Sequence, residues 1–181
     1  KYKEFKGSSG ALSYNSQIVV EGSKKGRVYI DLNSDGLTSL QLDGEKERLA
    51  LIEFLETTYA KFEEWEKTAK ENNVTKKLTK VISSDRLGNG LVFKRYSSGD
   101  WYFNFNSVEI SAGMFIPEGG DKISYYLRVP SVASYDNEYI ESDAQVMIFD
   151  KSDISSLTDI LTTQSVSTFN NEQNSVEDLF K

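Results

Sequence analysis

One stretch decides the fold of this chain: RVYIDLNSDGLTSLQLDGEKERLALIEFLETTYAKF, residues 27–62. At its start, Val28, Ile30 and Leu32 alternate with polar or amphipathic side chains, which is the period of a half-buried strand. Residues 33–36 then have the composition of a turn. This pattern predicts that residues 11–42 form strands.

The second part of the stretch predicts a long amphipathic helix over residues 45–72. Apolar side chains recur at spacings of three and four from Leu51 to Trp65, which makes one apolar stripe. Asp43 is the expected N-cap, and Asn72 is expected to end the helix. Phe54 lies off the stripe and is a candidate contact residue between subunits.

A second block of strands and a shorter helix follow a polar, basic stretch. Strands are expected over residues 91–96, 101–106, 108–116, 122–129 and 146–149, and a helix over residues 150–164 with Asp150 or Ser152 as its cap. On the strand of residues 101–106, the side chains expected to face the core are Trp101, Phe103 and Phe105. Tyr102 is expected on the opposite, polar face.

The two halves share their order and their offsets. Both run from an apolar strand through a short polar cap into an amphipathic helix, and three apolar positions match: Leu42, Leu51 and Leu55 against Ile148, Leu157 and Leu161. The sequence therefore predicts an α+β protein of two β-then-helix repeats. Residues 1–165 are expected to form one domain, with halves of about 8–73 and 74–165, followed by a flexible acidic tail over residues 166–181.

Composition excludes several kinds of chemistry. The 181 residues include no Cys and no His, so thiolate catalysis, disulfides, imidazole metal ligands and Ser–His triads are ruled out. Residues 33–36 lack the spacing of a calcium loop, and the Gly pairs lack the Lys-Ser/Thr signature of a phosphate-binding loop. We therefore expect no catalytic residues, no metal and no cofactor, and a protein that is not an enzyme.

Charge and hydropathy bear on partners and location. The net charge is −7, and residues 131–181 hold ten acidic side chains against two lysines, so the rest of the chain is near neutral with local basic runs. No apolar run is long enough for a membrane helix, and no signal peptide is visible. We expect a cytoplasmic protein without a membrane partner.

Cations and aromatic side chains on the expected polar strand faces suggest binding of single-stranded nucleic acid. Cations neutralise phosphates, and aromatic rings stack on unpaired bases. Tyr is also a good strand former, and Tyr–cation pairs across strands stabilise sheets, so each residue also suits an ordinary sheet. The predicted binding face comprises Lys25, Arg27, Tyr29, Lys94, Arg95, Tyr96, Tyr102, Tyr126 and Arg128. The alternative is a β-rich module that binds a protein or a glycan, for which an exported location would also fit.

The repeated strands and helix resemble the Whirly architecture. The residues that carry the resemblance are residues 26–32, residues 37–42 and the helix from Glu45, then a second unit from Gly90 to the helix ending near Gln164. The related fold called positive cofactor four has one such unit per chain. The resemblance covers about residues 5–165 and implies antiparallel sheets packed with helices, a homo-oligomer formed through the helices, and sequence-tolerant binding of single-stranded DNA in replication, recombination or annealing. A phage or plasmid replication protein would suit it.

The end of the chain resembles the acidic tails of replication single-strand-binding proteins. Its tip consists of Glu177, Asp178, Leu179 and Phe180, followed by Lys181. The resemblance implies that this tail recruits replication or recombination proteins. A polar terminal segment without a role is the other interpretation.

Overall fold

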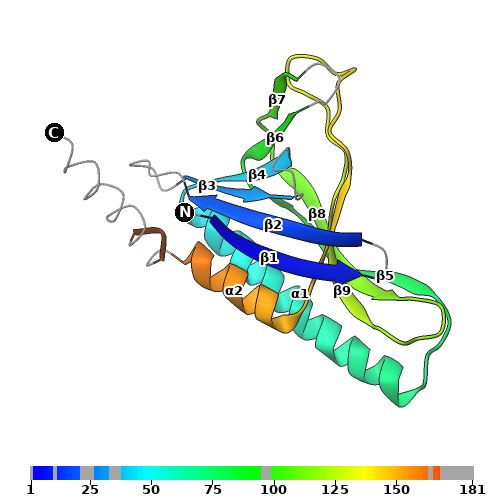
Figure 1. Ribbon diagram of the computed structural model, residues 1–181. Helices are drawn as coiled ribbons and strands as arrows, with labels where there is room; N and C mark the ends of the chain where they lie inside the picture. Colours follow the sequence, from blue (N-terminus) through cyan, green and yellow to red (C-terminus); the bar gives the residue numbers. More distant parts are fainter. Residues whose placement is uncertain are drawn as a thin grey trace.

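The computed structural model describes residues 2–9, 12–20, 27–32, 38–94, 99–162 and 165–167, with side chains from Val28 onward. Two antiparallel sheets, one long helix and one shorter helix make up this part of the chain (Figure 1). The expected α+β class is therefore confirmed. Among the described residues, no helix is both long enough and apolar enough to cross a membrane.

The first repeat is an antiparallel meander that leads into the long helix. Each of its strands pairs with the next one along the chain. The elements are β1 (Tyr2–Ser9), β2 (Leu12–Val20), β3 (Arg27–Asp31), β4 (Thr38–Asp43) and α1 (Glu45–Glu71).

The second repeat has the same plan but contains an inserted hairpin. Its own sheet has the order β10-β9-β8-β5, and the short helix α2 follows. The hairpin of β6 and β7 lies between β5 and β8 in sequence but joins the first sheet at β4, which extends that sheet to six strands. In Figure 1 this hairpin projects away from the two helices. The elements are β5 (Leu78–Leu87), β6 (Gly90–Lys94), β7 (Trp101–Asn104), β8 (Val108–Ile116), β9 (Ser124–Val129), β10 (Gln145–Phe149) and α2 (Lys151–Leu161).

The strand-to-helix junctions of the two repeats are equivalent. In both, one residue separates the last strand from the helix, Gly44 in the first repeat and Asp150 in the second. The expected order of strands and then a helix, twice, is thus confirmed. All six matched apolar positions are buried: Leu42, Leu51, Leu55, Ile148, Leu157 and Leu161.

Capping differs between the two helices. Of the two expected caps of α2, Asp150 takes the position: its side chain accepts a hydrogen bond from the Asp153 amide at 2.9 Å, while the Asp153 side chain accepts one from the Asp150 amide. The expected cap of α1 is wrong: Asp43 is the last residue of β4, and Gly44 takes the N-cap position with a positive φ of 100° and no side-chain cap. Asn72 is the C-cap of α1, which confirms the predicted end.

Buried polar contacts connect the helices to each other and to the second sheet. The Arg48 Nε of α1 donates to the Leu161 carbonyl at 3.1 Å, so a buried cation lies at the negative C-terminal end of α2. On the same helix, the Thr58 hydroxyl lies 2.7 Å from the hydroxyl of Tyr125 on β9. The apolar stripe of α1 therefore packs in the core with its few polar groups satisfied.

Two strands were not predicted, β1 and β5. In β5 all residues except Ile82 and Leu87 are exposed, so no alternation of apolar and polar side chains marks this strand. The basic stretch in the sequence is therefore an edge strand that is exposed on both faces.

Candidate functional site

Strand β7 carries two exposed aromatic side chains, Trp101 and Phe103, on the face that was expected to be buried. Its register pairs Tyr102 with Phe93 and Trp101 with Lys94. Phe93 is 2% exposed, so Tyr102 turns inward beside it, with the two ring centroids 5.8 Å apart and the ring planes 29° apart. Trp101 and Phe103 therefore point outward, and their predicted burial is wrong.

Four exposed rings lie on β7 or beside it, and we call this set the aromatic strip: Trp101, Phe103, Phe105 and Tyr135. Their exposed fractions are 48%, 38%, 58% and 68%. The Phe103 and Phe105 rings are nearly parallel, at 8°, with centroids 5.9 Å apart. The Tyr135 ring meets Phe105 edge-on, with a centroid distance of 5.6 Å. Large rings of this exposure are available to stack on a flat ligand.

Backbone contacts hold Tyr135 beside β7 although it comes from the connection between β9 and β10. The Tyr135 amide donates to the Phe103 carbonyl at 2.7 Å, and the Asn104 side-chain amide donates to the Ala133 carbonyl at 2.8 Å. In Figure 1 the connection, drawn in yellow, runs up to the hairpin and returns. The strip is thus built from the inserted hairpin and the β9–β10 connection, which these hydrogen bonds join.

Charges of both signs border the strip. The ammonium of Lys94 lies 5.8 Å from the centroid of the Trp101 ring, within the range of a cation–π interaction. Next to strip residues in the sequence are Asp100 and Asp136, and Glu138 follows two residues further on; all three are exposed. The strip therefore has one described cation beside it, and three exposed carboxylates lie within three residues of its members in the sequence.

The sheet face that carries the strip continues across the first sheet toward β3, where its polar residues Ser39 and Asp31 are buried. Cross-strand pairs connect Phe103 to Val92, Val92 to Ser39, and Ser39 to Asp31. The Ser39 hydroxyl donates to the buried Asp31 carboxylate at 2.5 Å, and burial raises the pKa of this carboxyl despite that hydrogen bond. Tyr29, half-buried and paired with Gln41, shares the face two residues along the strand.

Two predicted site residues lie on the other sheet. Arg128 of β9 is exposed, but Tyr126 is only 6% exposed, contrary to expectation. Tyr126 is paired with Gly113, and a Cβ at that position would meet the Tyr126 hydroxyl at less than a van der Waals distance. The ring therefore lies over the space that the glycine leaves, and its burial raises the pKa of the phenol.

The structure describes no side chain for the other residues of the predicted site. Arg27 lies in β3 opposite Asp43, without a described side chain. Outside the described residues lie Lys25, Arg95, Tyr96, Glu177, Asp178, Leu179 and Phe180. Of the predicted face, Lys94 lies beside Trp101 of the strip, and Tyr29 shares its sheet face three strands away on β3. Tyr102 is inward, and Tyr126 and Arg128 belong to the second sheet.

One carboxylate pair is used for helix capping. Hydrogen bonds from the Ser152 hydroxyl and the Asp153 amide lower the pKa of Asp150, while burial raises the pKa of Asp153. Both groups bind the first turn of α2. In the part of the chain that the structure describes, no three acidic side chains are close enough together to hold a metal ion.

The strip was missed because aromatic residues occur on both faces of β7. Trp101, Phe103 and Phe105 alternate with Tyr102 and Asn104, so hydropathy alone favours burying the first set.

Comparison of the chain with protein-family models, with curated proteins and with solved structures finds no match.

Proposed function

We propose that this protein binds single-stranded DNA on the outer face of its six-stranded sheet. The observation that carries the proposal is the aromatic strip, four exposed rings on β7 and the neighbouring connection, with the Lys94 ammonium beside Trp101. In this proposal the rings stack on unpaired bases and Lys94 contacts the phosphate backbone.

The energetics favour a single strand over a duplex. Stacking of one base on an aromatic side chain contributes about 1–3 kcal/mol, and it requires a base face that a duplex does not expose. Two or three stacked bases would contribute about 2–9 kcal/mol, against the about 8 kcal/mol to which a micromolar affinity corresponds, and phosphate contacts would add to this. Because every base has such a face, the binding would tolerate different sequences.

The repeated plan of the fold supports the resemblance to Whirly proteins. Four antiparallel strands and a helix occur twice in this chain, once β6 and β7 are set aside as an insertion. In this proposal the inserted hairpin adds the aromatic strip to the sheet of the first repeat.

A second candidate function is recognition of a protein or a glycan by the same strip. The observation that favours it is the group of carboxylates, Asp100, Asp136 and Glu138, because carboxylates repel phosphates but accept hydrogen bonds from sugar hydroxyls or from basic side chains. The two functions differ in their dependence on salt.

Fluorescence anisotropy with a labelled oligothymidine and a matched duplex, at about 50 and 200 mM salt, tests the proposal. We expect preferential binding to the single strand that weakens as salt rises, because phosphate contacts release counterions. Absence of binding by folded protein at low salt would refute the proposal and leave the second candidate.

Variants locate the site. Trp101→Ala and Phe105→Ala should each weaken binding to oligothymidine by about tenfold or more, because each removes one stacking ring. The matched control is Tyr139→Ala, which removes an exposed ring outside the strip. Equal losses in all three variants would show that the strip is not the binding surface.

A further inference from the structure

Strand β5 has a free edge. It is the last strand of the second sheet and pairs with β8 on one side, while no described strand pairs with its other side. Its ten residues therefore present a row of backbone N–H and C=O groups to any strand that approaches. In Figure 1, β5 extends together with β8 and the second half of α1 away from the rest of the molecule.

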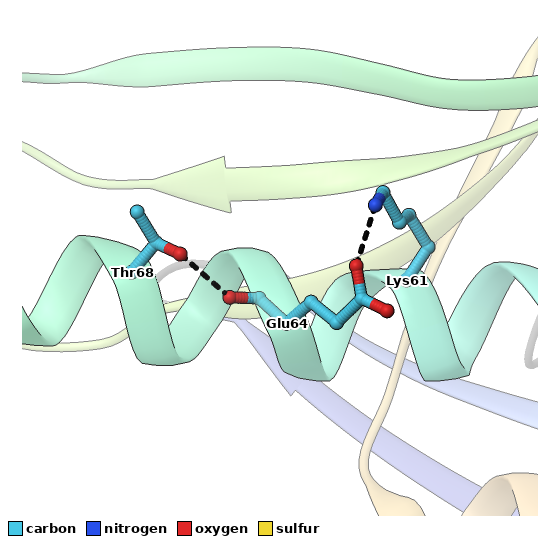
Figure 2. A network of polar contacts seen from close by, with 3 residues as sticks. All are labelled: Lys61, Glu64 and Thr68. Atoms are coloured by element: carbon cyan, nitrogen blue, oxygen red, sulfur yellow. Dashed lines mark hydrogen bonds and ion pairs between the residues drawn. The ribbon is translucent and has the colours of Figure 1, made fainter.

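A groove of about 610 Å³ runs between this edge and α1. The helix contributes a stripe that includes Ala50, Glu53 and Lys61, and β5 contributes Ile82, Ser83 and Asp85. Phe54, the candidate subunit contact, is buried in the wall of the groove. Figure 2 shows part of this helix, where Lys61 forms an ion pair with Glu64 and the Thr68 hydroxyl donates to the Glu64 carbonyl.

The charges of the groove and of the strand are complementary. The groove wall holds three carboxylates against one ammonium, because Glu53, Glu64 and Asp85 outnumber Lys61. The strand and the residues just before it have the opposite excess, four cations against Asp85: Lys76, Lys77, Lys80 and Arg86. A basic extended strand is therefore the occupant that this groove fits, and the chain itself carries one.

We propose that the groove binds β5 of a second copy of this chain. The two β5 strands would pair antiparallel across a two-fold axis near Ser84, joining the two four-stranded sheets and placing each strand over the α1 stripe of the other copy. Such a contact is isologous, so each copy gives its basic strand and receives one. This proposal does not depend on the proposed DNA binding.

The geometry identifies one ion pair in this contact. In its own copy, the Lys80 ammonium lies 4.1 Å from the centroid of the Trp65 ring on α1. Antiparallel pairing centred between Ser83 and Ser84 would bring Lys80 of the other copy opposite Leu87, roughly 20 Å further along the strand. On α1, roughly 20 Å corresponds to about thirteen residues. About thirteen residues before Trp65, the helical residue beside Lys80 in its own copy, is the neighbourhood of Glu53. Lys80 of one copy is therefore expected to face Glu53 of the other.

A competing account is that β5 is protected from pairing. A β-bulge interrupts its register between Val81 and Ser83, and Lys80 and Arg86 add charge, and both are devices that keep sheet edges apart. The groove beside this bulge and the acidic helix facing a basic strand favour pairing instead. The oligomeric state decides between these accounts.

The test is sedimentation velocity of the full chain over a wide concentration range, with a charge-swap pair. Wild-type protein should form a dimer. Glu53→Lys and Lys80→Glu should each weaken dimerisation by about tenfold or more, because each brings like charges together twice in a symmetric contact. An equimolar mixture of the two variants should form a heterodimer, since both contacts are then matched.

Controls keep the test decisive. Glu56→Lys makes the same charge change on an exposed position of α1 outside the groove and should leave the dimer intact. Circular dichroism checks folding, and Glu53→Lys, on an exposed helical position, remains informative if Lys80→Glu fails to fold. A wild-type monomer at all concentrations, a dimer unaffected by Glu53→Lys, or two folded variants that do not associate would each overturn the proposal.

Discussion

Two groups of aromatic side chains show opposite environments for the same chemistry. In the core, the rings of Tyr59 and Phe62 meet Tyr125 edge-on and are tilted relative to each other, with all centroids 5.2 to 5.7 Å apart, and Tyr125 is completely buried. The aromatic strip has similar spacings, 5.6 and 5.9 Å, but its rings are exposed. Contact between rings therefore does not by itself distinguish a core cluster from a surface cluster. What distinguishes them is whether the remaining faces of the rings are covered by protein or exposed to solvent.

The largest effect should come from removing the central core ring. Tyr125→Ala should lower the free energy of unfolding by about 3–5 kcal/mol, because it leaves a cavity between α1 and β9. Urea denaturation of the full chain measures this cost. A cost below about 1 kcal/mol would mean that the core cluster is no more important for stability than the strip.

Filling the space under Tyr126 should have the next largest effect. Gly113→Ala places a methyl group against the Tyr126 hydroxyl and the Lys80 carbonyl, and we expect a loss of about 1–3 kcal/mol from overpacking. Adding Tyr126→Phe removes the hydroxyl and should restore part of that loss in the same denaturation assay. An undiminished loss in the double variant would show that the hydroxyl is not the source of the strain and would leave the Tyr126 ring carbon Cζ and the Lys80 carbonyl as the close contacts.

Removing only the polar end of the core ring should cost less. Tyr125→Phe loses the hydrogen bond to the Thr58 hydroxyl, which still donates to the Phe54 carbonyl at 2.6 Å. We expect a loss of about 1 kcal/mol in unfolding free energy. A double-mutant cycle with Thr58→Ala checks the pairing, because the two losses should then not add.

Raising the pH above about 10 should lower the free energy of unfolding through Tyr59, and this effect should be smaller. Burial, and then the nearby carboxylates of Glu63 and Glu66, raise the pKa of Tyr59 to about 12. In the unfolded chain a tyrosine ionises near pH 10, so the folded state holds more protons between about pH 10 and 12. The unfolding free energy should therefore fall as pH rises through that window. Denaturation at successive pH values should show that the unfolding free energy of Tyr59→Phe falls less steeply than that of the wild-type protein.

The smallest effect on stability should come from the strip. Phe105→Ala should change the unfolding free energy by no more than about 0.5 kcal/mol, because the ring is largely exposed. Thermal denaturation measures this change in the same protein used for binding. A loss approaching that of Tyr125→Ala would show that the strip is part of the core and would argue against a binding surface.

Regular local patterns could be predicted from the sequence. The spacing from Leu51 to Trp65 and the residues Asn72 and Asp150 located the helices, because helix periodicity and capping depend on neighbours within a few residues. The equal offsets around Leu42 and Ile148 also indicated two equivalent junctions. Asp43 misled the prediction of the α1 cap, since it belongs to β4 and leaves the cap to Gly44.

Features that depend on sheet partners could not be predicted. Edge strand β5 is polar on both faces, so its sequence carries no alternation. The burial of Tyr126 depends on a glycine in the neighbouring strand β8. These positions are set by residues distant in sequence.

The sequence by itself determined the two helices, the end of α1 and the alternation of strands with a helix, because periodicity and capping are local; it did not reveal β1 or β5. Only the tertiary structure decided which face of β7 is buried. Both faces carry aromatic rings, and the pairing of Tyr102 with the buried Phe93 turns Trp101 and Phe103 toward solvent. Since successive side chains of a strand point to opposite faces, one residue of register exchanges core and surface.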